Sequence, residues 1–441
     1  MAGSLLAIGY TALLLLLMRR THFFARVPGL PVQWISALFL LKIAAGVALW
    51  AVYTYVYTDR STADVFKYFD DSAHMFKALH EHPLDYLRMV FGIANDTPEF
   101  RDLYYQDMNN WVRHYESNLY NDAHTIIRFN AVVRLLSFGE FHVHTVIAAF
   151  LSFTGLVGLY RAFVKFLPGM ERALMAVVFL LPSVLFWASG VIKESLLFFG
   201  LGLLLYQIAQ WGEHRLRWRD PFLLAFTIIM LFFLKFYVLM SLLPALILFS
   251  WSRLSIRPGL ALKVLVVYGL FILVGLNLHH IVPGMDVLGI LTMKQRDFVG
   301  LAIQMDSGSL VMPKLLLPDV WLFLSQAPYA VYIALLGPLA HAGPGPLGLL
   351  SAVENFAFFA ILACCLFYHR PWHAVDWTLL VAMLMYILVL SVVIGWTTPV
   401  MGAVVRYRTP LLPFLLIAGL LVIDRERVVQ AHPWCRILLS A

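Results

Sequence analysis

Long apolar runs separated by short polar segments recur from one end of the 441-residue chain to the other. A helix needs about 20 apolar residues to cross a bilayer, so these runs are typical of membrane spans. The pattern predicts an all-α polytopic membrane protein with about eleven transmembrane helices. The predicted spans are 4–18, 32–57, 142–160, 173–191, 195–211, 221–234, 237–251, 261–279, 348–368, 375–396 and 409–423.

Basic residues gather in short clusters between the apolar runs, as the positive-inside rule predicts for cytoplasmic loops. The clusters are Arg19, Arg20 and Arg26; Arg161, Lys165 and Arg172; Arg215, Arg217 and Arg219; and Arg253, Arg257 and Lys263. Two clusters flank the apolar run 221–251, which Lys235 interrupts, so we expect a helical hairpin that turns there. One long tilted helix, with its lysine reaching the interface, is the alternative.

This topology predicts two large extracytoplasmic loops, 58–141 and 280–347, in a single membrane domain spanning 1–441. Within the second loop, the apolar stretch 321–339 contains repeated prolines, which remove helix donors. We therefore expect an interfacial or re-entrant helix there rather than a full span.

The composition supports the membrane assignment, and the absence of several sequence motifs disfavours some functional classes. Hydrophobic residues make up 61% of the chain and charged residues 13%, which is too apolar for a soluble domain. The net charge of +7 is accounted for by the loop clusters, so we expect no nucleic-acid partner. No P-loop, Gly-x-Ser-x-Gly or His-Glu-x-x-His motif is present, which disfavours ATP-driven transport, serine hydrolysis and zincin chemistry.

The first outer loop contains the stretch S-T-A-D-V-F-K-Y-F-D-D-S-A-H at 61–74, which predicts a helix. Its apolar residues form one stripe at helical spacing, expected along the membrane surface: Val65, Phe69, Ala73 and Phe76. Asp64, Lys67 and Asp71 share a polar face, whereas Asp70 lies about 100° away. These carboxylates are candidate catalytic groups; a solvated, internally paired polar face is the alternative.

Other polar residues interrupt apolar runs on the predicted outer side. Lys193 and Glu194, in P-S-V-L-F-W-A-S-G-V-I-K-E-S, are costly near membrane depth unless paired or functional, and a self-paired turn is the alternative. Arg406 and Arg408, in V-V-R-Y-R-T-P-L-L-P, oppose the positive-inside tendency and suit an anion or an interhelical salt bridge.

Four further residues complete the set of candidates. Arg128 lies on an amphipathic piece before a predicted span, and Arg296 lies in a second-loop segment that could act as a lid or be plain surface. Glu354 lies near the start of a predicted span, where it is either functional or satisfied by neighbouring helices. His74 follows the acidic stretch directly.

This layout resembles the GT-C superfamily of integral-membrane glycosyltransferases, which use lipid-phosphate-linked sugar donors. The similarity rests on the acidic motif with its amphipathic helix, the many spans, the second outer loop, and the R-Y-R-x-P-x-x-P element from Arg406 to Pro413. The resemblance implies a polyprenyl-phosphate sugar donor and a glycan, lipid or protein acceptor. It also implies a location in a bacterial inner membrane, with the active face extracytoplasmic.

The resemblance also implies roles for the candidate residues. It makes Asp71, Asp64 or Asp70 a catalytic base or the ligand of a divalent cation, and it leaves open which aspartate serves and whether a metal is needed. The donor phosphate would be held by basic residues, namely Lys193, Arg406, Arg408, Arg296 and Arg128. Supporting roles fall to Glu194, His74 and Glu354.

Two other functions fit the same sequence. An O-antigen-type polymerase or ligase would depend on outer-face arginines rather than on an aspartate base. A transporter of lipid-linked saccharides would line a cavity with Lys193, Glu194 and the arginines, and would form no covalent product.

Overall fold

The computed structural model describes residues 2–113, 120–211, 218–343 and 345–439. Within these ranges every named element is a helix, and the only extended pairings are isolated bridges. The described residues up to 236 form one compact unit and those from 237 form another. Arg215 and Arg217 lie outside the described residues.

Among the described residues, eight helices are long and apolar enough to cross a membrane. They are Gly3–Arg20, Val32–Tyr55, Phe141–Phe166, Arg219–Leu254, Leu260–Ile281, Leu347–Phe367, Trp377–Thr397 and Met401–Val422. The chain is therefore an all-α, multi-pass membrane protein, as the sequence predicts. The expected number of eleven spans is not confirmed.

The predicted span 173–191 is not one helix but two. α9 (Glu171–Phe179) ends before α10 (Pro182–Trp187), and Leu181 between them is extended, with ψ of 119°. A residue before proline is pushed out of the helical region, and Pro182 donates no backbone hydrogen bond. The expectation of a continuous span there is wrong.

The apolar run that contains Lys235 forms α12 (Arg219–Leu254), which is interrupted at that residue. Lys235 has φ of −151° and ψ of 76°, so two helical stretches meet where the sequence predicted a turn. Its side chain is buried, with 4% of it exposed. The alternative of one unbroken helix with a lysine at the interface is therefore wrong.

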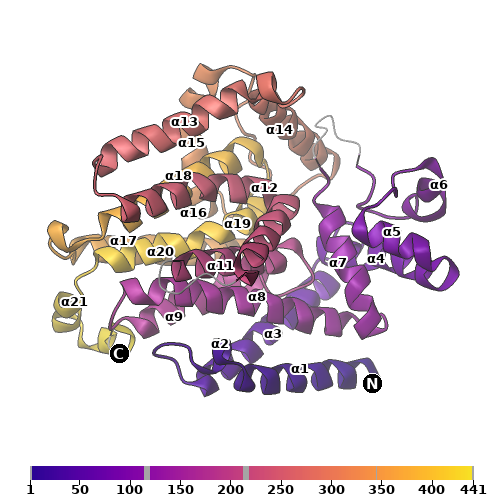
Figure 1. The fold of residues 1–441 in the computed structure, drawn as a ribbon, viewed down its shortest axis with the longest axis horizontal. Helices are drawn as coiled ribbons and strands as arrows, with labels where there is room; N and C mark the ends of the chain where they lie inside the picture. Colours follow the sequence, from indigo (N-terminus) through magenta and orange to yellow (C-terminus); the bar gives the residue numbers. More distant parts are fainter. Residues whose placement is uncertain (1, 114–119, 212–217, 344, 440–441) are drawn as a thin grey trace. The chain divides into compact units, whose positions relative to one another are not determined.

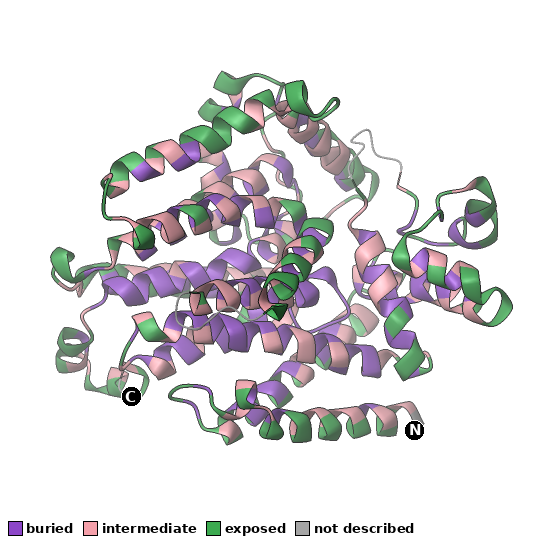
Figure 2. Cartoon of the chain, viewed as in Figure 1, coloured by how far each residue is buried: buried purple, intermediate pink, exposed green. Residues whose placement is uncertain are grey.

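α8 (Phe141–Phe163) is the centre of the first unit. α1 (Ala2–Arg20), α3 (Val32–Tyr55) and α11 (Lys193–Gln210) pack against it (Figure 1). Figure 2 shows α8 largely buried and much of α1 exposed. Glycines let α8 and α11 approach closely, since a Cβ at Gly202 would overlap the carbonyl oxygen of Gly155.

The first predicted outer loop is built from short helices within the same unit. These are α4 (Asp64–Glu81), α5 (Pro83–Phe91), α6 (Pro98–Phe100), the π-helical turn η1 (Arg101–Tyr105) and α7 (Ala123–Ser137). α4 packs against both α5 and α7. A short chain segment joins α7 to α8, so this group of helices is tied directly to a candidate span.

The apolar stripe of α4 points into the protein, contrary to the expectation that it lies on the membrane. Val65 packs with Leu49 of α3 and Ile192, and Phe69 lies 5.1 Å from Phe141 of α8 between ring centroids. Exposed apolar side chains of the loop lie on α5, on α7 and in the segments that join or follow them. They are Leu84, Leu87, Phe91, Ile93, Leu103, Val112, Tyr120, Val132, Leu135, Leu136 and Phe138.

The second unit contains the remaining candidate spans. Its helices are α13 (Leu260–Ile281), α14 (Val287–Gln304), α15 (Val320–Leu335), α16 (Gly337–Ala340), α17 (Pro346–Phe367), η3 (Trp372–Ala374), α18 (Trp377–Thr397), α19 (Met401–Tyr407), η4 (Thr409–Leu411), α20 (Leu412–Val422), α21 (Arg425–Ala431), η5 (Pro433–Cys435) and α22 (Arg436–Leu439). α18 packs against α15 and α20. α15 has 16 residues and is shorter than the candidate spans.

The last candidate span begins earlier than the sequence predicts. It runs from Met401 through α19, η4 and α20 to Val422, whereas the expected span began at 409. Arg406 and Arg408 therefore lie inside the span rather than in front of it. Pro410 and Pro413 do not end the helical path because each lies at the first or second position of a new helix.

Candidate functional site

A buried, irregular stretch of backbone brings two charged residues into the interior of the first unit. α10 ends at Trp187, and α11 begins at Lys193 after a non-helical segment, 188–192, whose residues are all buried. The hydroxyl of Ser195 donates to the carbonyl of Gly190 at 2.6 Å and closes this turn. Lys193 and Glu194 are 8% and 2% exposed, so both need partners.

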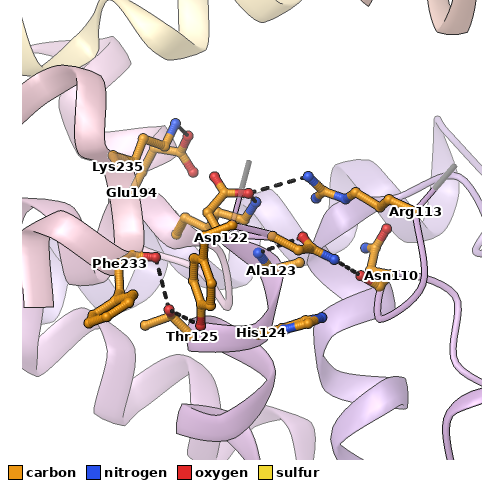
Figure 3. A network of polar contacts seen from close by, with 12 residues as sticks. Asn110, Arg113, Asp122, Ala123, His124, Thr125, Glu194, Phe233 and Lys235 are labelled. Carbon is orange, nitrogen blue, oxygen red and sulfur yellow. Dashed lines mark hydrogen bonds and ion pairs between the residues drawn. The ribbon is translucent and has the colours of Figure 1, made fainter. Parts of the chain in front are cut away.

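The partner of Lys193 is Asp122, which directly precedes α7. The Lys193 Nζ lies 2.8 Å from Asp122 Oδ1. The Arg113 guanidinium lies 3.3 Å from the same oxygen, as Figure 3 shows. Two cations thus converge on one carboxylate.

Electrostatics keeps this carboxylate ionised. Burial by itself would raise the pKa of Asp122, but the charges of Lys193 and Arg113 outweigh it and hold that pKa well below its usual range. Burial lowers the pKa of Lys193 to about 8, although Asp122 raises it in part. The charge of Asp64 also raises the pKa of Lys193.

Glu194 forms a second buried ion pair beside the first. Its Oε1 lies 2.9 Å from Nζ of Lys235, and the two side chains are 2% and 4% exposed (Figure 3). Lys235 is the residue at which α12 is broken. Near the break, the carbonyl of Phe233 accepts a hydrogen bond from the hydroxyl of Thr125 of α7, at 2.9 Å.

Asp71 has a different task, because its carboxylate holds the loop that leads to Arg113. It is fully buried and accepts the backbone N–H groups of Asn109 at 2.7 Å and Asn110 at 2.8 Å. Burial raises the pKa of Asp71, even though these bonds and the charge of nearby His74 lower it. The carboxylate is committed to backbone donors and lies away from solvent.

Asp70 and Asp71 separate as helical spacing predicted. Asp70 points to the surface and forms a bidentate pair with Arg60, at 2.8 Å to Nε and 2.6 Å to the terminal nitrogen. Asp64 is the first residue of α4 and is partly buried. The charge of Asp64 is among those that raise the pKa of Lys193.

Arg128 serves the packing of the outer loop. Its Nε donates to the carbonyl of Met89 at 2.8 Å, and a terminal nitrogen donates to the hydroxyl of Tyr120 at 3.2 Å. Its guanidinium also lies 5.4 Å from the ring centre of Trp111. The structure thus places Arg128 among backbone and aromatic partners.

Among the predicted residues of the second unit, Arg408 and Glu354 are buried. Arg408 is 1% exposed and donates to the carbonyl of Leu335 at 3.1 Å and to Oδ1 of Asn355 at 2.5 Å. Glu354, next to Asn355 on α17, is also buried. Arg408 thus makes hydrogen bonds to a carbonyl and an amide of neighbouring helices, whereas the alternative from the sequence was an interhelical salt bridge. Arg296 is exposed on α14.

Sequence reasoning missed Arg113 and Asp122 as site residues. One signal for Asp122 was available, because an Asn-Asp pair directly before an amphipathic segment is typical of a helix start. Nothing in the sequence pairs Arg113 with Lys193, since they lie on segments far apart in the chain. In the described part of the chain, no three His, Cys, Asp or Glu side chains are grouped to hold a metal ion.

Comparisons with protein-family models, with curated proteins and with solved structures found no match to this chain.

Proposed function

We propose that this protein transfers a sugar from a polyprenyl-phosphate-linked donor to a glycan, lipid or protein acceptor at the extracytoplasmic face of the membrane. The observation that carries this proposal is the convergence of Lys193 and Arg113 on one anionic position. Asp64, the first residue of α4, is the proposed base because it is only partly buried and its charge raises the pKa of Lys193. A donor of this class needs cations at its phosphate and a base near the acceptor hydroxyl.

The proposed reaction uses these three residues in separate roles. The acceptor oxygen forms a bond to the anomeric carbon while the bond from that carbon to the phosphate oxygen breaks. Asp64 takes the proton of the acceptor hydroxyl, and the polyprenyl phosphate departs against Lys193 and Arg113. Asp122 is a poor base, because two cations hold its pKa low.

In this proposal Asp71 is a positioning residue. It accepts the backbone N–H groups of Asn109 and Asn110 and thereby positions the short segment that leads to Arg113. Asp70 faces solvent with Arg60 and takes no part in the reaction. Arg406 and Arg296 remain predicted phosphate contacts from the sequence.

The test is transfer by the purified protein in liposomes, supplied with a radiolabelled polyprenyl-phosphate sugar and an acceptor extract. We expect Asp64→Asn and Lys193→Gln to lower the transfer rate at least about 100-fold, because a general base contributes about 10²–10⁴-fold. The matched control is Asp85→Asn, which alters an outer-loop carboxylate paired with Arg88 at 3.2 Å. Full activity of both site variants would refute the assignment.

One observation favours a second function, the transport of a lipid-linked saccharide. The Glu194–Lys235 pair is buried at a break in α12, and broken helices with buried charges are typical of transporter sites. Movement of the labelled lipid across the liposome membrane, without a new glycoside, would support transport. A new glycoside formed without an added energy source would support the transferase.

A further inference from the structure

The Asp122 carboxylate lies where an anion of another molecule would find two cations. Lys193 and Arg113 approach the same oxygen atom, Oδ1, at 2.8 Å and 3.3 Å. Ammonium and guanidinium groups bind carboxylate and phosphate oxygens by the same charge-assisted hydrogen bonds. A phosphate oxygen at this position would satisfy both cations equally well.

Asp122 also lies at the N-terminal end of a helix, where an aspartate side chain usually caps the first turn. It is the residue before α7, where an aspartate side chain normally accepts an N–H from the first helical turn. Here the side chain makes no such bond and is turned toward the cations. Asn121 instead accepts the N–H of Ala123, at 3.1 Å.

The two partners of the ion pair differ in how much of each side chain is exposed to solvent. The Asp122 side chain is 34% exposed, whereas that of Lys193 is 10% exposed and packs 5.2 Å from the ring centre of Tyr68. The carboxylate is therefore the more accessible partner of this ion pair, while the lysine lies among buried residues.

We propose that Asp122 is an internal competitor for the phosphate of a lipid-linked substrate: it holds Lys193 and Arg113 until the phosphate displaces it. The proposal rests on the proposed function for the identity of the ligand, and it adds a regulatory role for a residue outside the predicted site. Before any phosphate binds, the single negative charge of Asp122 compensates part of the positive charge of Lys193 and Arg113 and so lowers the cost of holding these cations away from water. The consequence is a weaker affinity for phosphate than the two cations alone would give.

The test measures binding of farnesyl phosphate, a short prenyl phosphate, to the full-length protein in detergent by microscale thermophoresis. Inorganic phosphate and the neutral alcohol farnesol are tested alongside, to separate the headgroup from the lipid chain. Asp122→Asn keeps the shape of the side chain and removes its charge. We expect about tenfold tighter binding of farnesyl phosphate, or about 1.4 kcal/mol, and no change for farnesol.

Three further proteins make the result specific. Asp85→Asn removes an ion-paired carboxylate elsewhere in the outer loop and should change the affinity less than twofold. The double variant Asp122→Asn with Lys193→Gln should lose the gain, because the gain requires the released lysine. Asp122→Ser is the substitute if the asparagine variant is not monodisperse.

The outcomes separate this proposal from the proposed function. Unchanged or weaker farnesyl phosphate binding in Asp122→Asn overturns the competitor role, even if the protein transfers sugar. An equal gain in Asp85→Asn also overturns it, because a general charge effect would then explain the result. Tighter binding that depends on Lys193, in a protein that transfers no sugar, supports the competitor role and refutes the transferase. If inorganic phosphate gains as much as farnesyl phosphate, the phosphate group alone is recognised.

Discussion

The substitution Asp71→Asn tests whether this aspartate positions the outer loop or acts in the reaction. The carboxylate is fully buried and each of its oxygens accepts one backbone N–H, from Asn109 at 2.7 Å and from Asn110 at 2.8 Å. An asparagine has one acceptor oxygen, so its NH₂ group would face one of these donors. One charge-assisted bond is lost and a buried N–H is left unsatisfied.

The expected cost follows from these two bonds. A buried unsatisfied donor costs about 1–3 kcal/mol, and a hydrogen bond to a charged group contributes about 1.5–3 kcal/mol. We expect the variant to destabilise the segment around 109–110 by about 2–3 kcal/mol. Because each 1.4 kcal/mol is tenfold in an equilibrium, exchange of protected amides in this segment should accelerate about 30- to 140-fold.

Hydrogen–deuterium exchange of the detergent-purified protein measures this directly. Asp70→Asn is the matched control, since the neighbouring carboxylate pairs with Arg60 at the surface and should contribute no more than about 1 kcal/mol. Sugar transfer should also fall in Asp71→Asn, because Arg113 is displaced. Unchanged exchange at 109–110 together with lost transfer would refute the positioning role and return Asp71 to the reaction itself.

Three further predictions concern the charges and the packing of the first unit. Binding of farnesyl phosphate should weaken as the pH rises through about 8, because Lys193 binds the phosphate as a cation and loses its proton there. The variant Lys193→Arg should extend binding to higher pH. Equal affinity at all pH values between about 7 and 9.5 would contradict this prediction. Glu194→Gln should lower the free energy of unfolding by about 3–5 kcal/mol, because it leaves the buried charge of Lys235 without its partner. The double variant Glu194→Leu with Lys235→Met should recover part of this lost stability. Thermal unfolding measures both effects. Gly202→Ala should destabilise the protein by about 1–3 kcal/mol, because the added methyl group would overlap Gly155. Gly269→Ala is the control and should be tolerated, since no atom lies within 4 Å of the added methyl group. Equal melting temperatures for the two alanine variants would refute the close approach of α8 and α11.

The candidate site was predicted in part. Helical spacing separated Asp70 from Asp71, and the cost of charge near membrane depth singled out Lys193 and Glu194. The partners of these residues could not be predicted, because Asp122 is 71 positions away from Lys193 and Lys235 is 41 positions away from Glu194. Contacts over such distances depend on how α7, α11 and α12 pack.

The stripe of Val65 and Phe69 was read correctly as one face of a helix but assigned to the wrong surroundings. A membrane surface and the side of a neighbouring helix both favour the same apolar residues, so periodicity alone does not distinguish them. Packing against α3 and α8 decided this face.

Span length, apolar composition and the position of a charge are local properties, so an all-α membrane protein with a break near Lys235 could be predicted from the residues alone. What each charged group does depends on the packing of helices that are distant in the chain. This packing buried Asp71 under backbone donors, turned Asp70 to the surface, and gathered Arg113, Asp122 and Lys193 into one site. The physical reason is that an ion pair depends on distances of a few ångströms between side chains, and those distances are fixed by helix packing rather than by spacing along the chain.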